Sequence, residues 1–441
     1  MVRAYVLSGL LLVSGCQGVS WTPPIEAVVP REWIIRFQET MPISERARLA
    51  TQARARAVVK LGASAERWRV SDDQPVRDLN EQTGIKWIQP NYRRHLSLPE
   101  QDGSVETGGR LPGEVLRTLA QINAPGDPEY RRQWHLPRCQ FPEAWRLTKG
   151  RGVLVGVIDS GCDPQHPDLS ANLLPLIDEV VAIGGSDVLD EVNYDQRDSH
   201  GHGTHVCGIV GAIANNGIGV SGGAPETRIL PIKVTPSSGD TDDATIAKGI
   251  IDGVDRGCRV LNLSIGGPEP SPMLLEALNY AFERNVVVVI AAGNDGRGVN
   301  YPAAYAGVVS VGAIASDNRV TGYSSRGENL VLVAPGGAAP GGGTQGIFST
   351  LPTYPCYLSR YDRKPNDYGS LAGTSMAAPV VSAVAALLLS LEPNLTTAQV
   401  RTRLAAAAED SGTPGFDPVY GYGILNSISA LTTRDDDGGP N

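Results

Sequence analysis

The sequence lacks an excess of basic residues, and it lacks a long uninterrupted apolar run. Its formal net charge of −9 argues against nucleic acid as the main partner, because a phosphate-binding surface would be basic. No uninterrupted apolar run reaches the ~18 residues that span a bilayer, which excludes an integral membrane architecture. With 441 residues, 41% of them hydrophobic and 19% charged, the chain is neither disordered nor fibrous and can bury a large core.

Cysteine is scarce, with six in the chain, and one of them closes a segment typical of an export signal. Residues 1–15 hold one basic residue, Arg3, then an apolar stretch that ends in small residues. The run Val13-Ser14-Gly15-Cys16 resembles a bacterial lipoprotein processing site, in which the Cys becomes the lipidated N-terminus. An ordinary secretory signal is the alternative. We therefore expect export, either to the cell envelope through a lipid on Cys16, with outer-membrane sorting suggested by Gln17, or to the medium after processing.

Charge divides the rest of the chain into a small basic part and a large acidic part. Residues 20–98 hold 13 Lys and Arg against 9 Asp and Glu, so the remainder carries the negative excess. This asymmetry predicts two domains with complementary surfaces. We expect an α+β domain at 31–97, a linker rich in Pro, Gly and acidic residues at 98–128, a larger domain at 129–432 and a disordered acidic tail at 433–441.

Hydrophobic periodicity predicts the elements of both domains. The small domain reads as two strands, at 32–37 and 84–92, with a helix at 44–61. The larger domain has strands that are apolar on both faces and are separated by helices, which predicts an α/β fold with a doubly wound, mainly parallel sheet covered by helices on both faces. Its strands are expected at 153–158, 228–234, 260–265 and 286–292, and its helices at 242–254, 272–282 and 380–391. Ligands of such sheets lie beyond the carboxyl ends of the strands.

One carboxylate and one cluster of histidines stand out in the larger domain. Asp159 ends the first apolar strand, where a lone carboxylate would most simply cap a turn. His200, His202 and His205 lie within six residues and could form a zinc cluster or hold one catalytic imidazole. The Gly-Thr pair between His202 and His205 favours the start of a helix.

Two further polar residues occupy positions suited to stabilising negative charge. Ser375 precedes a run that is apolar nearly all round and should form a buried helix, so it would lie at a helix N-terminus. A helix-capping serine is the alternative. Asn294 follows the strand at 286–292, and its amide could donate to a developing oxyanion or simply belong to a turn.

The run Gly219-Val220-Ser221-Gly222-Gly223 matches a nucleophile elbow, which requires a strand before it and a helix after it. Asn-Asn-Gly precedes it and Ala-Pro follows it, so we interpret it as a loop and reject Ser221 as a nucleophile.

In the chain order Asp159, His202, Asn294 and Ser375, these segments resemble the subtilisin-like serine peptidases over about residues 129–432. The resemblance implies a serine endopeptidase that acts on protein or peptide substrates through an acyl-enzyme. Asp159, His202 and Ser375 would form the triad, and Asn294 with the Ser375 N–H would form the oxyanion hole.

The resemblance also implies a substrate-aligning strand and an inhibitory propeptide. The strand matches VLNLSIGG at 260–267, with Ser264, Ile265 and Gly266 binding substrate, and the run YGYG at 420–423 resembles the family's C-terminal signature. Residues 31–97 resemble the propeptide in size, in position and in the run WIQPNY at 87–92.

If this propeptide occupies the cleft, the active site would cut its own chain between about Arg94 and Arg132. A lipid on Cys16 would lie on the propeptide side of that cut, so cleavage would free the peptidase from the membrane. High salt should then speed release, because exposed ion pairs are screened.

A loop of the larger domain resembles a calcium site of the family. There, backbone carbonyls combine with an Asn and a distant Asp, and such oxygen donors on a flexible loop suit calcium. A solvated Asn-Gly turn is the alternative. The matching residues are Asp168, Ala214, Asn216, Ile218 and Val220, with Gln133 as a further candidate.

With Cys16 lipidated, five cysteines remain, and an odd count leaves at least one unpaired. Cys258 is most simply a small core residue. Because the triad would bring their segments together, Cys162 and Cys207 are the preferred bridge.

Two other function classes remain open at this point. An inactive binding or scaffold protein would be expected to lack a triad member, but all four catalytic positions are filled. A zinc hydrolase built on His200, His202 and His205 would lose activity with a zinc chelator, whereas a serine peptidase would lose it with a fluorophosphonate.

Overall fold

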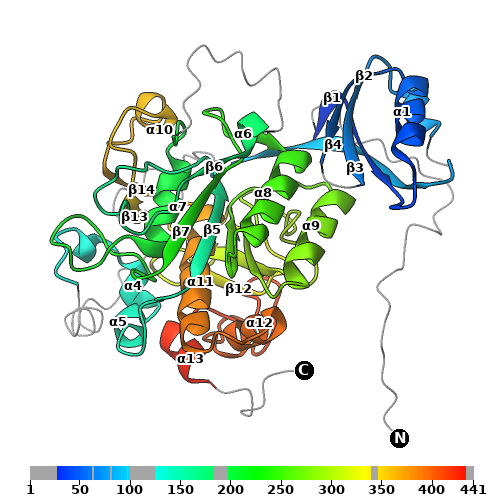
Figure 1. Cartoon of the computed structure of the whole chain (residues 1–441). Helices are drawn as coiled ribbons and strands as arrows, with labels where there is room; N and C mark the ends of the chain where they lie inside the picture. The colour runs from blue at the N-terminus through cyan, green and yellow to red at the C-terminus, as the bar shows by residue number, and fades with distance from the viewer. Residues whose placement is uncertain are drawn as a thin grey trace, which may run out of the picture.

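The computed structural model describes residues 27–61, 64–79, 82–96, 98–99, 125–182, 197–338 and 346–433. The expected export signal, Cys16, most of the linker and the acidic tail beyond Thr433 lie outside these residues. The described residues form an N-terminal unit, residues 28–95, and a larger unit, residues 130–432 (Figure 1).

The N-terminal unit is an antiparallel sheet covered on one face by helices. Its sheet order is β2-β3-β1-β4, and Trp33, Ile35 and Phe37 on one face of β1 pack with Leu49 of α1. Ile34 points to the opposite face and belongs to a core that this unit shares with the larger one. Its elements are β1 (Val28–Phe37), α1 (Ile43–Gln52), β2 (Ala55–Lys60), β3 (Ala65–Val70), α2 (Gln74–Arg77) and β4 (Ile85–His95).

The helix expected at 44–61 is wrong in its second half. The helix α1 ends at Gln52, Arg54 takes a φ of 55°, and the chain returns as β2 beside β3. The Ala and Arg residues of this segment have a helical propensity, but pairing with β3 overrides it. The two expected strands are confirmed as parts of β1 and β4.

The larger unit is built on a seven-stranded parallel sheet with the order β12-β11-β10-β9-β5-β7-β6. Along β10, Val287 and Val289 belong to one core and Val288 and Ile290 to another, so both faces of the strand are buried. The strands are β5 (Leu154–Asp159), β6 (Ile177–Asp178), β7 (Arg228–Lys233), β9 (Val260–Leu263), β10 (Val287–Ala291), β11 (Val309–Ile314) and β12 (Leu332–Pro335).

Helices cover both faces of this sheet, which confirms the doubly wound α/β prediction (Figure 1). The helix α8 (Asp243–Asp255) begins with Asp242 accepting from the Thr245 N–H, and α9 (Pro272–Phe282) begins at a capping Ser271 followed by Pro272. These two helices pack on one face, and the helices α7 (His202–Gly211) and α11 (Thr374–Leu391) on the other.

The remaining elements of the larger unit are short or peripheral. They are η2 (Tyr130–Arg132), α4 (His135–Arg138), α5 (Phe141–Ala144), α6 (Glu179–Ala182), β8 (Asp240–Asp242), β13 (Ile347–Thr350), α10 (Tyr357–Arg360), β14 (Tyr368–Leu371), α12 (Thr397–Ala406) and α13 (Ser427–Thr432).

The helix α11 is long and apolar enough to cross a membrane by length and composition. In the structure 89% of that stretch is buried, and its residues belong to the same hydrophobic cluster as those of α7. Its apolar character therefore reflects burial on nearly all sides.

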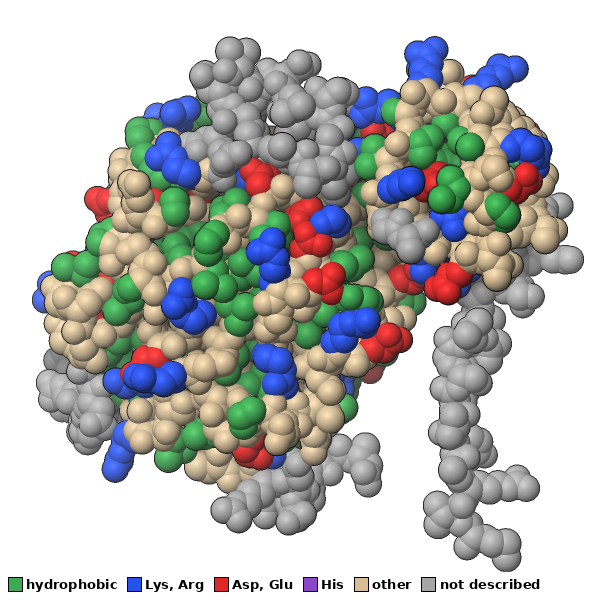
Figure 2. Space-filling model, in the orientation of Figure 1, with side chains coloured by type: hydrophobic (Ala, Val, Ile, Leu, Met, Phe, Trp, Pro, Cys, Tyr) green, Lys and Arg blue, Asp and Glu red, His purple; other side chains and the backbone are tan. Residues whose placement is uncertain are grey.

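A strand joins the two units. Arg93, Arg94 and His95 at the end of β4 pair antiparallel with β8, so the sheet of the N-terminal unit gains a fifth strand from the larger unit. Figure 2 shows the N-terminal unit as a separate lobe against the larger one, on whose visible face acidic and basic side chains are interspersed.

Candidate active site

Three neighbouring strands bring the predicted polar residues to one edge of the sheet. Asp159 is the last residue of β5, Ser264 directly follows β9, and Asn294 lies three residues beyond β10. Because β10, β9 and β5 are adjacent and parallel, their carboxyl ends meet at the same edge. This edge is where ligands of doubly wound sheets bind.

Asp159 and His202 form a buried pair. The Nδ1 atom of His202 lies 2.8 Å from Oδ1 and 3.0 Å from Oδ2 of Asp159, and neither side chain is exposed. The N–H of Ser160 also donates to Oδ1 of Asp159 at 2.8 Å. His202 is the first residue of α7, and its Nε2 atom has no hydrogen-bond partner among the described residues.

Asp198 holds the start of α7 in place and was missed by the sequence reasoning. This buried carboxylate accepts from the N–H groups of Gly201 and Thr204, each at 2.7 Å, and from the hydroxyls of Thr204 at 2.6 Å and Ser160 at 2.8 Å. It therefore ties the loop after Asp159 to the turn that carries His202. An Asp just before a helix start is a capping signal that could have revealed it.

Ser375 is the second residue of α11, at the helix end where backbone N–H groups point outward. The preceding Gly373 has a φ of 146°, which a residue with a side chain rarely adopts, and this allows the strand-to-helix turn. The hydroxyl of Ser375 donates to the carbonyl of Ser264 at 3.4 Å, and the Ser264 hydroxyl donates to the Ser375 carbonyl at 3.1 Å. The helix α11 packs against α7, so the Ser375 and His202 helices are neighbours.

Asn294 is fixed by the residue next to Ser375. Its Oδ1 atom accepts from both the N–H and the hydroxyl of Thr374, each at 2.9 Å. These two contacts orient the amide, so its NH₂ group faces away from Thr374 as a donor. Thr374 is a second residue that the sequence reasoning did not single out.

The three clustered histidines point in different directions. His205 is buried, and its Nε2 atom contacts the carbonyls of Ile347 and Gly369 at 3.1 and 3.2 Å. His200 is stacked on Tyr357 with the ring centroids 5.1 Å apart. Burial lowers the pKa of His205 to about 3, and burial and then His202 lower the pKa of His200 to about 4.

Within the part of the chain that the structure describes, no group of three or more His, Cys, Asp or Glu side chains is arranged to hold a metal ion. Because only His202 of the three turns toward Asp159, the zinc cluster considered as an alternative does not form.

The expected substrate strand lies beside the end of the N-terminal unit. Ser264 and Ile265 are buried and Gly266 is half-buried. Gly266 forms an antiparallel bridge with His95, the last residue of β4. A strand of this same chain therefore already pairs with the segment that was expected to align substrates.

The loop between α7 and β7 wraps around the Asp168 carboxylate. Asn216 Nδ2 donates to Oδ1 of Asp168 at 2.6 Å, and the Val220 N–H donates to Oδ2 at 2.7 Å. The carbonyls of Ala214, Ile218 and Val220 accept no hydrogen bond from any other residue that the structure describes. The loop thus holds this buried carboxylate through N–H donors, and burial raises the pKa of Asp168.

Two neighbouring side chains complete this loop. Asp127, which sequence reasoning missed, accepts from the N–H groups of Asn215 and Gly217 at 2.8 and 3.2 Å. Gln133 exchanges hydrogen bonds with the backbone of Ser221 at 2.7 and 2.8 Å, so it supports the loop. Ser221 itself lies in this loop, as the rejection of the elbow motif required.

The five described cysteines are all buried and free, so the expected Cys162–Cys207 bridge is absent from the structure. The two cysteines are nevertheless close, because the Cys162 thiol is hydrogen-bonded to Cys207. Burial is the main cause that raises the pKa of Cys207, and the hydrogen bond with Cys162 is the next.

The doubly wound sheet and the polar side chains at its carboxyl edge define a subtilisin-like α/β enzyme. The sequence model of the Subtilase family, Peptidase_S8, matches residues 150–423. The chain belongs to the subtilase family and is a subtilisin-like serine endopeptidase.

Three similar proteins illustrate the extent of the match. The Minor extracellular protease Epr of Bacillus subtilis (strain 168) is 36% identical over 303 residues, which cover 68% of this chain and 42% of that protein. The Thermophilic serine proteinase of Bacillus sp. (strain AK1) is 31% identical over 414 residues, 92% of this chain and 88% of that one. The solved structure of fervidolysin from Fervidobacterium pennivorans, a keratinolytic enzyme related to subtilisin, has a TM-score of 0.75 and 26% identity, and covers 93% of this chain and 62% of its own.

Proposed function

We propose that Asp159, His202 and Ser375 form the catalytic triad of this endopeptidase. The observation that carries the proposal is the buried contact between Asp159 and His202. It fixes the Nδ1–H tautomer of the imidazole, and it leaves the Nε2 atom without a described partner, as a base needs.

The mechanism follows from the chemistry of these groups. A serine hydroxyl is a weak nucleophile and needs a base. As the Ser375 oxygen attacks the substrate carbonyl carbon, His202 Nε2 takes its proton, and Asp159 stabilises the imidazolium that forms. His202 then gives this proton to the leaving amine, and a water molecule activated in the same way hydrolyses the acyl-enzyme.

The oxyanion of the tetrahedral intermediate would be held by the Asn294 amide and the Ser375 N–H. The contacts of Thr374 with Asn294 support this role, because they orient the amide before substrate arrives. The N-terminus of α11 adds a favourable dipole for negative charge.

Labelling with a fluorophosphonate probe tests the triad. The native chain should be labelled and Ser375→Ala should not. Ser221→Ala is the matched control and should be labelled like the native chain, since the Ser221 hydroxyl contacts only the next carbonyl, at 3.4 Å. Labelling of Ser375→Ala would overturn the assignment.

We infer that the N-terminal unit is an inhibitory propeptide that covers the cleft. Its strand β4 pairs with β8, His95 pairs with Gly266, and Pro99 reaches to within 3.5 Å of where a Cβ of Gly373 would be. The end of β4 therefore lies at the expected substrate strand, and Pro99 lies near the Ser375 turn.

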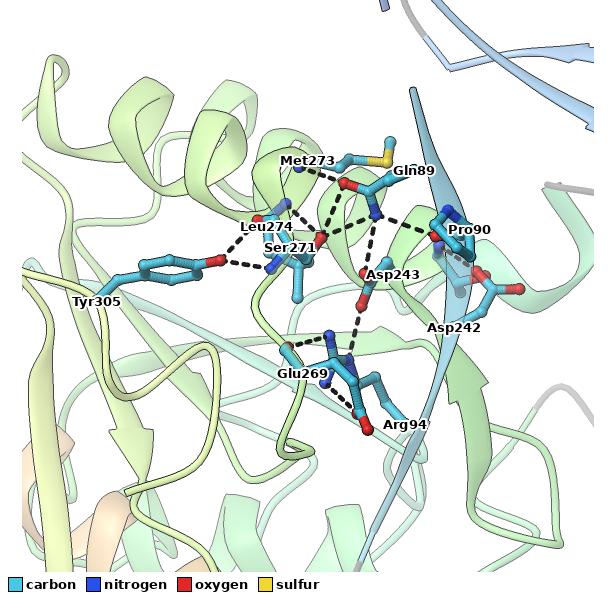
Figure 3. A network of polar contacts seen from close by, with 11 residues as sticks. Gln89, Pro90, Arg94, Asp242, Asp243, Glu269, Ser271, Met273, Leu274 and Tyr305 are labelled. Carbon is cyan, nitrogen blue, oxygen red and sulfur yellow. Dashed lines mark hydrogen bonds and ion pairs between the residues drawn. The ribbon is translucent and has the colours of Figure 1, made fainter. Parts of the chain in front are cut away.

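Helix starts of the larger unit support this docking. Gln89 of β4 contacts Oδ2 of Asp243 at 3.2 Å and the Ser271 hydroxyl at 3.1 Å, and it accepts from the Met273 N–H at 3.0 Å (Figure 3). One buried side chain thus joins the first residues of α8 and α9 to β4.

Export and self-release complete the proposal. Propeptides are removed by cleavage, and a cut between about Arg94 and Arg132 would separate the peptidase from a lipid on Cys16. The relative named Minor extracellular protease Epr supports export of this chain. The proposal predicts a membrane-held precursor and a mature enzyme that leaves with, or without, the bound N-terminal unit.

We propose that the loop around Asp168 holds a structural calcium ion. The fit rests on its oxygen atoms: a buried carboxylate and three backbone carbonyls that accept no described hydrogen bond. The amide oxygen of Asn216 now accepts from the Ile218 N–H at 3.0 Å and would turn to the ion. Asp168, Ala214, Asn216, Ile218 and Val220 would supply these oxygens, and the ion would brace the loop after α7.

A further inference from the structure

The side chain of Arg94 fills a pocket built by the larger unit. Its Nε atom donates to Oδ1 of Asp243 at 2.7 Å, and its Nη2 atom donates to the carbonyl of Glu269 at 2.8 Å (Figure 3). Its Nη1 atom lies 3.7 Å from Oε2 of the same Glu269. Arg94 and Asp243 are both fully buried. Each of the three guanidinium nitrogens of Arg94 thus faces an oxygen atom of the larger unit, an arrangement that suits the planar fork of arginine.

Glycine forms the floor of this pocket. A Cβ at Gly267 would lie 2.7 Å from Nη1 of Arg94 and 3.4 Å from its Cδ atom. The backbone of Gly267 exchanges hydrogen bonds with that of Tyr301 at 2.8 and 2.9 Å, which holds the floor in place. The space above Gly267 therefore has the size and the position of a guanidinium.

The pocket directly adjoins the segment that aligns substrates. Gly267 follows Gly266, and Gly266 pairs with His95, the residue after Arg94. Farther along, the Leu96 N–H donates to the Gly239 carbonyl at 3.0 Å, and Pro99 lies beside Gly373. The described residues Arg94 to Leu96 and Pro99 therefore lie along the path that an extended substrate would take toward Ser375.

We infer that the Arg94 pocket, formed by Asp243, Gly267 and Glu269, is a substrate subsite that selects arginine. The inference rests on the proposed peptidase function. When the N-terminal unit leaves, the pocket presents two carboxylates without their cation, and their negative field attracts a cationic side chain. A substrate arginine placed just before the residue that pairs with Gly266 restores the same contacts. Lysine lacks the bidentate fork and fits less well.

Peptides derived from this chain test the inference. The substrate is an internally quenched peptide with the sequence of residues 88–106, cleaved by the mature enzyme freed of its N-terminal unit. Replacing the arginine at the position of Arg94 by Gln should lower kcat/KM about tenfold or more. A peptide with Lys at this position should have a kcat/KM between those of the Arg and Gln peptides. The matched control is Arg93→Gln. Arg93 is exposed and bonds to the Val28 carbonyl of its own unit, so its loss should change kcat/KM less than about twofold.

Two enzyme variants complete the test. In Asp243→Asn the arginine contact is weakened, and in Gly267→Ala the space for the guanidinium is filled. Each should bring the ratio of kcat/KM for the Arg and Gln peptides toward one. Gly267→Ala acts by volume alone, so it keeps the test valid if Asp243→Asn folds poorly.

The outcomes separate the two proposals. Equal kcat/KM for the Arg and Gln peptides with the native enzyme overturns the subsite, even if Asp243→Asn still weakens binding of the N-terminal unit. An enzyme that cleaves none of the peptides and no casein overturns the proposed peptidase function itself.

Discussion

Thr374 donates twice to Asn294, from its backbone N–H and from its hydroxyl, and both contacts are 2.9 Å long. The residue next to the proposed nucleophile therefore sets the orientation of the proposed oxyanion donor. The Gly293 N–H also donates to the Thr374 hydroxyl at 3.3 Å, so the segment after β10 is tied to the start of α11 at two neighbouring residues.

We expect Asn294→Ala to lower kcat far more than it raises KM. The amide would bond chiefly to the transition state, and loss of such a donor costs about 2.7–4 kcal/mol in subtilisin, or a factor of about 10²–10³. Steady-state kinetics on a peptide substrate measures both constants. A raised KM with an unchanged kcat would contradict the role.

Thr374→Val should act in the same direction but more weakly, because the backbone N–H of residue 374 still holds the amide. We expect a decrease in kcat of roughly tenfold, the value of one hydrogen bond to a buried group. Thr374→Ser, which keeps the hydroxyl, is the matched control and should retain most of kcat. Equal losses in the two variants would show that the hydroxyl does not orient Asn294.

We expect Ser375→Ala to abolish hydrolysis while leaving the fold intact. One hydroxyl with a single 3.4 Å contact contributes little to stability. Peptide hydrolysis and the thermal unfolding midpoint would be measured together. In cells, Ser375→Ala should remain full length and membrane-bound, whereas the native chain is cut in the linker. A native chain that also stays full length would refute self-release.

Release of the N-terminal unit should depend on pH through His95. Asp240 hydrogen-bonds to His95 at 2.5 Å and raises its pKa, and His95 lowers the pKa of Asp240. A raised histidine pKa in the docked state means that the pair stabilises docking fully below about pH 6.5. This contribution is lost as pH rises through the raised pKa.

Because both side chains are more than half exposed, the effect should be modest. Dissociation of the cleaved complex should be about 2–5 times faster at pH 8 than at pH 5.5. Arg93, the neighbouring cation, opposes protonation of His95, and it is present in both the native chain and the His95→Gln variant. His95→Gln should flatten the profile, and an unchanged slope would exclude the pair.

Salt should affect release less than the charge asymmetry alone suggests. Arg94 and Asp243 are fully buried, and buried pairs are screened much less than exposed ones. Exposed pairs, such as Lys86 with Glu276, supply the salt-sensitive part. We expect Arg94→Gln to speed dissociation far more than 1 M NaCl does, as measured by size-exclusion of the cleaved complex. A larger effect of salt would show that surface charge dominates docking.

Removal of calcium should lower the unfolding temperature. At calcium about 100 times above its Kd, binding would stabilise the fold by roughly 2.7 kcal/mol, or about 5–10 °C. A chelator should cause this loss in the native enzyme and little change in Asp168→Asn. Identical unfolding temperatures with calcium and with chelator would refute the site.

Much of the larger unit was predictable because its strands and helices carry strong local signals. The helix at 272–282 begins with Ser-Pro, and its predicted bounds are confirmed. The helix predicted at 44–61 failed because Arg54 takes a left-handed conformation and pairing with β3 overrides local propensity. The sequence also predicted that Cys162 and Cys207 lie close together, but proximity does not decide whether two thiols are oxidised.

Side chains that hold others in place were harder to predict. Asp198 carries a local capping signal, but its contact with the Ser160 hydroxyl joins segments 38 residues apart, and Thr374 acts on Asn294, 80 residues away. The pocket of Arg94 depends on Asp243, Gly267 and Glu269, which meet only after α8 and the segment beyond β9 have packed. No pattern of spacing marks such an arrangement before folding.

Departure of the N-terminal unit would leave β8 as an unpaired strand edge, which is a general hazard for association between copies. This edge is only three residues long, and Asp240 and Asp242 lie at its two ends. Two mature molecules pairing antiparallel through β8 would bring these carboxylates opposite one another, and such like-charge pairs are destabilising. Asp240 and Asp242, which pair with His95 and Arg67 in the full chain, would therefore disfavour self-association at this edge once the N-terminal unit has left.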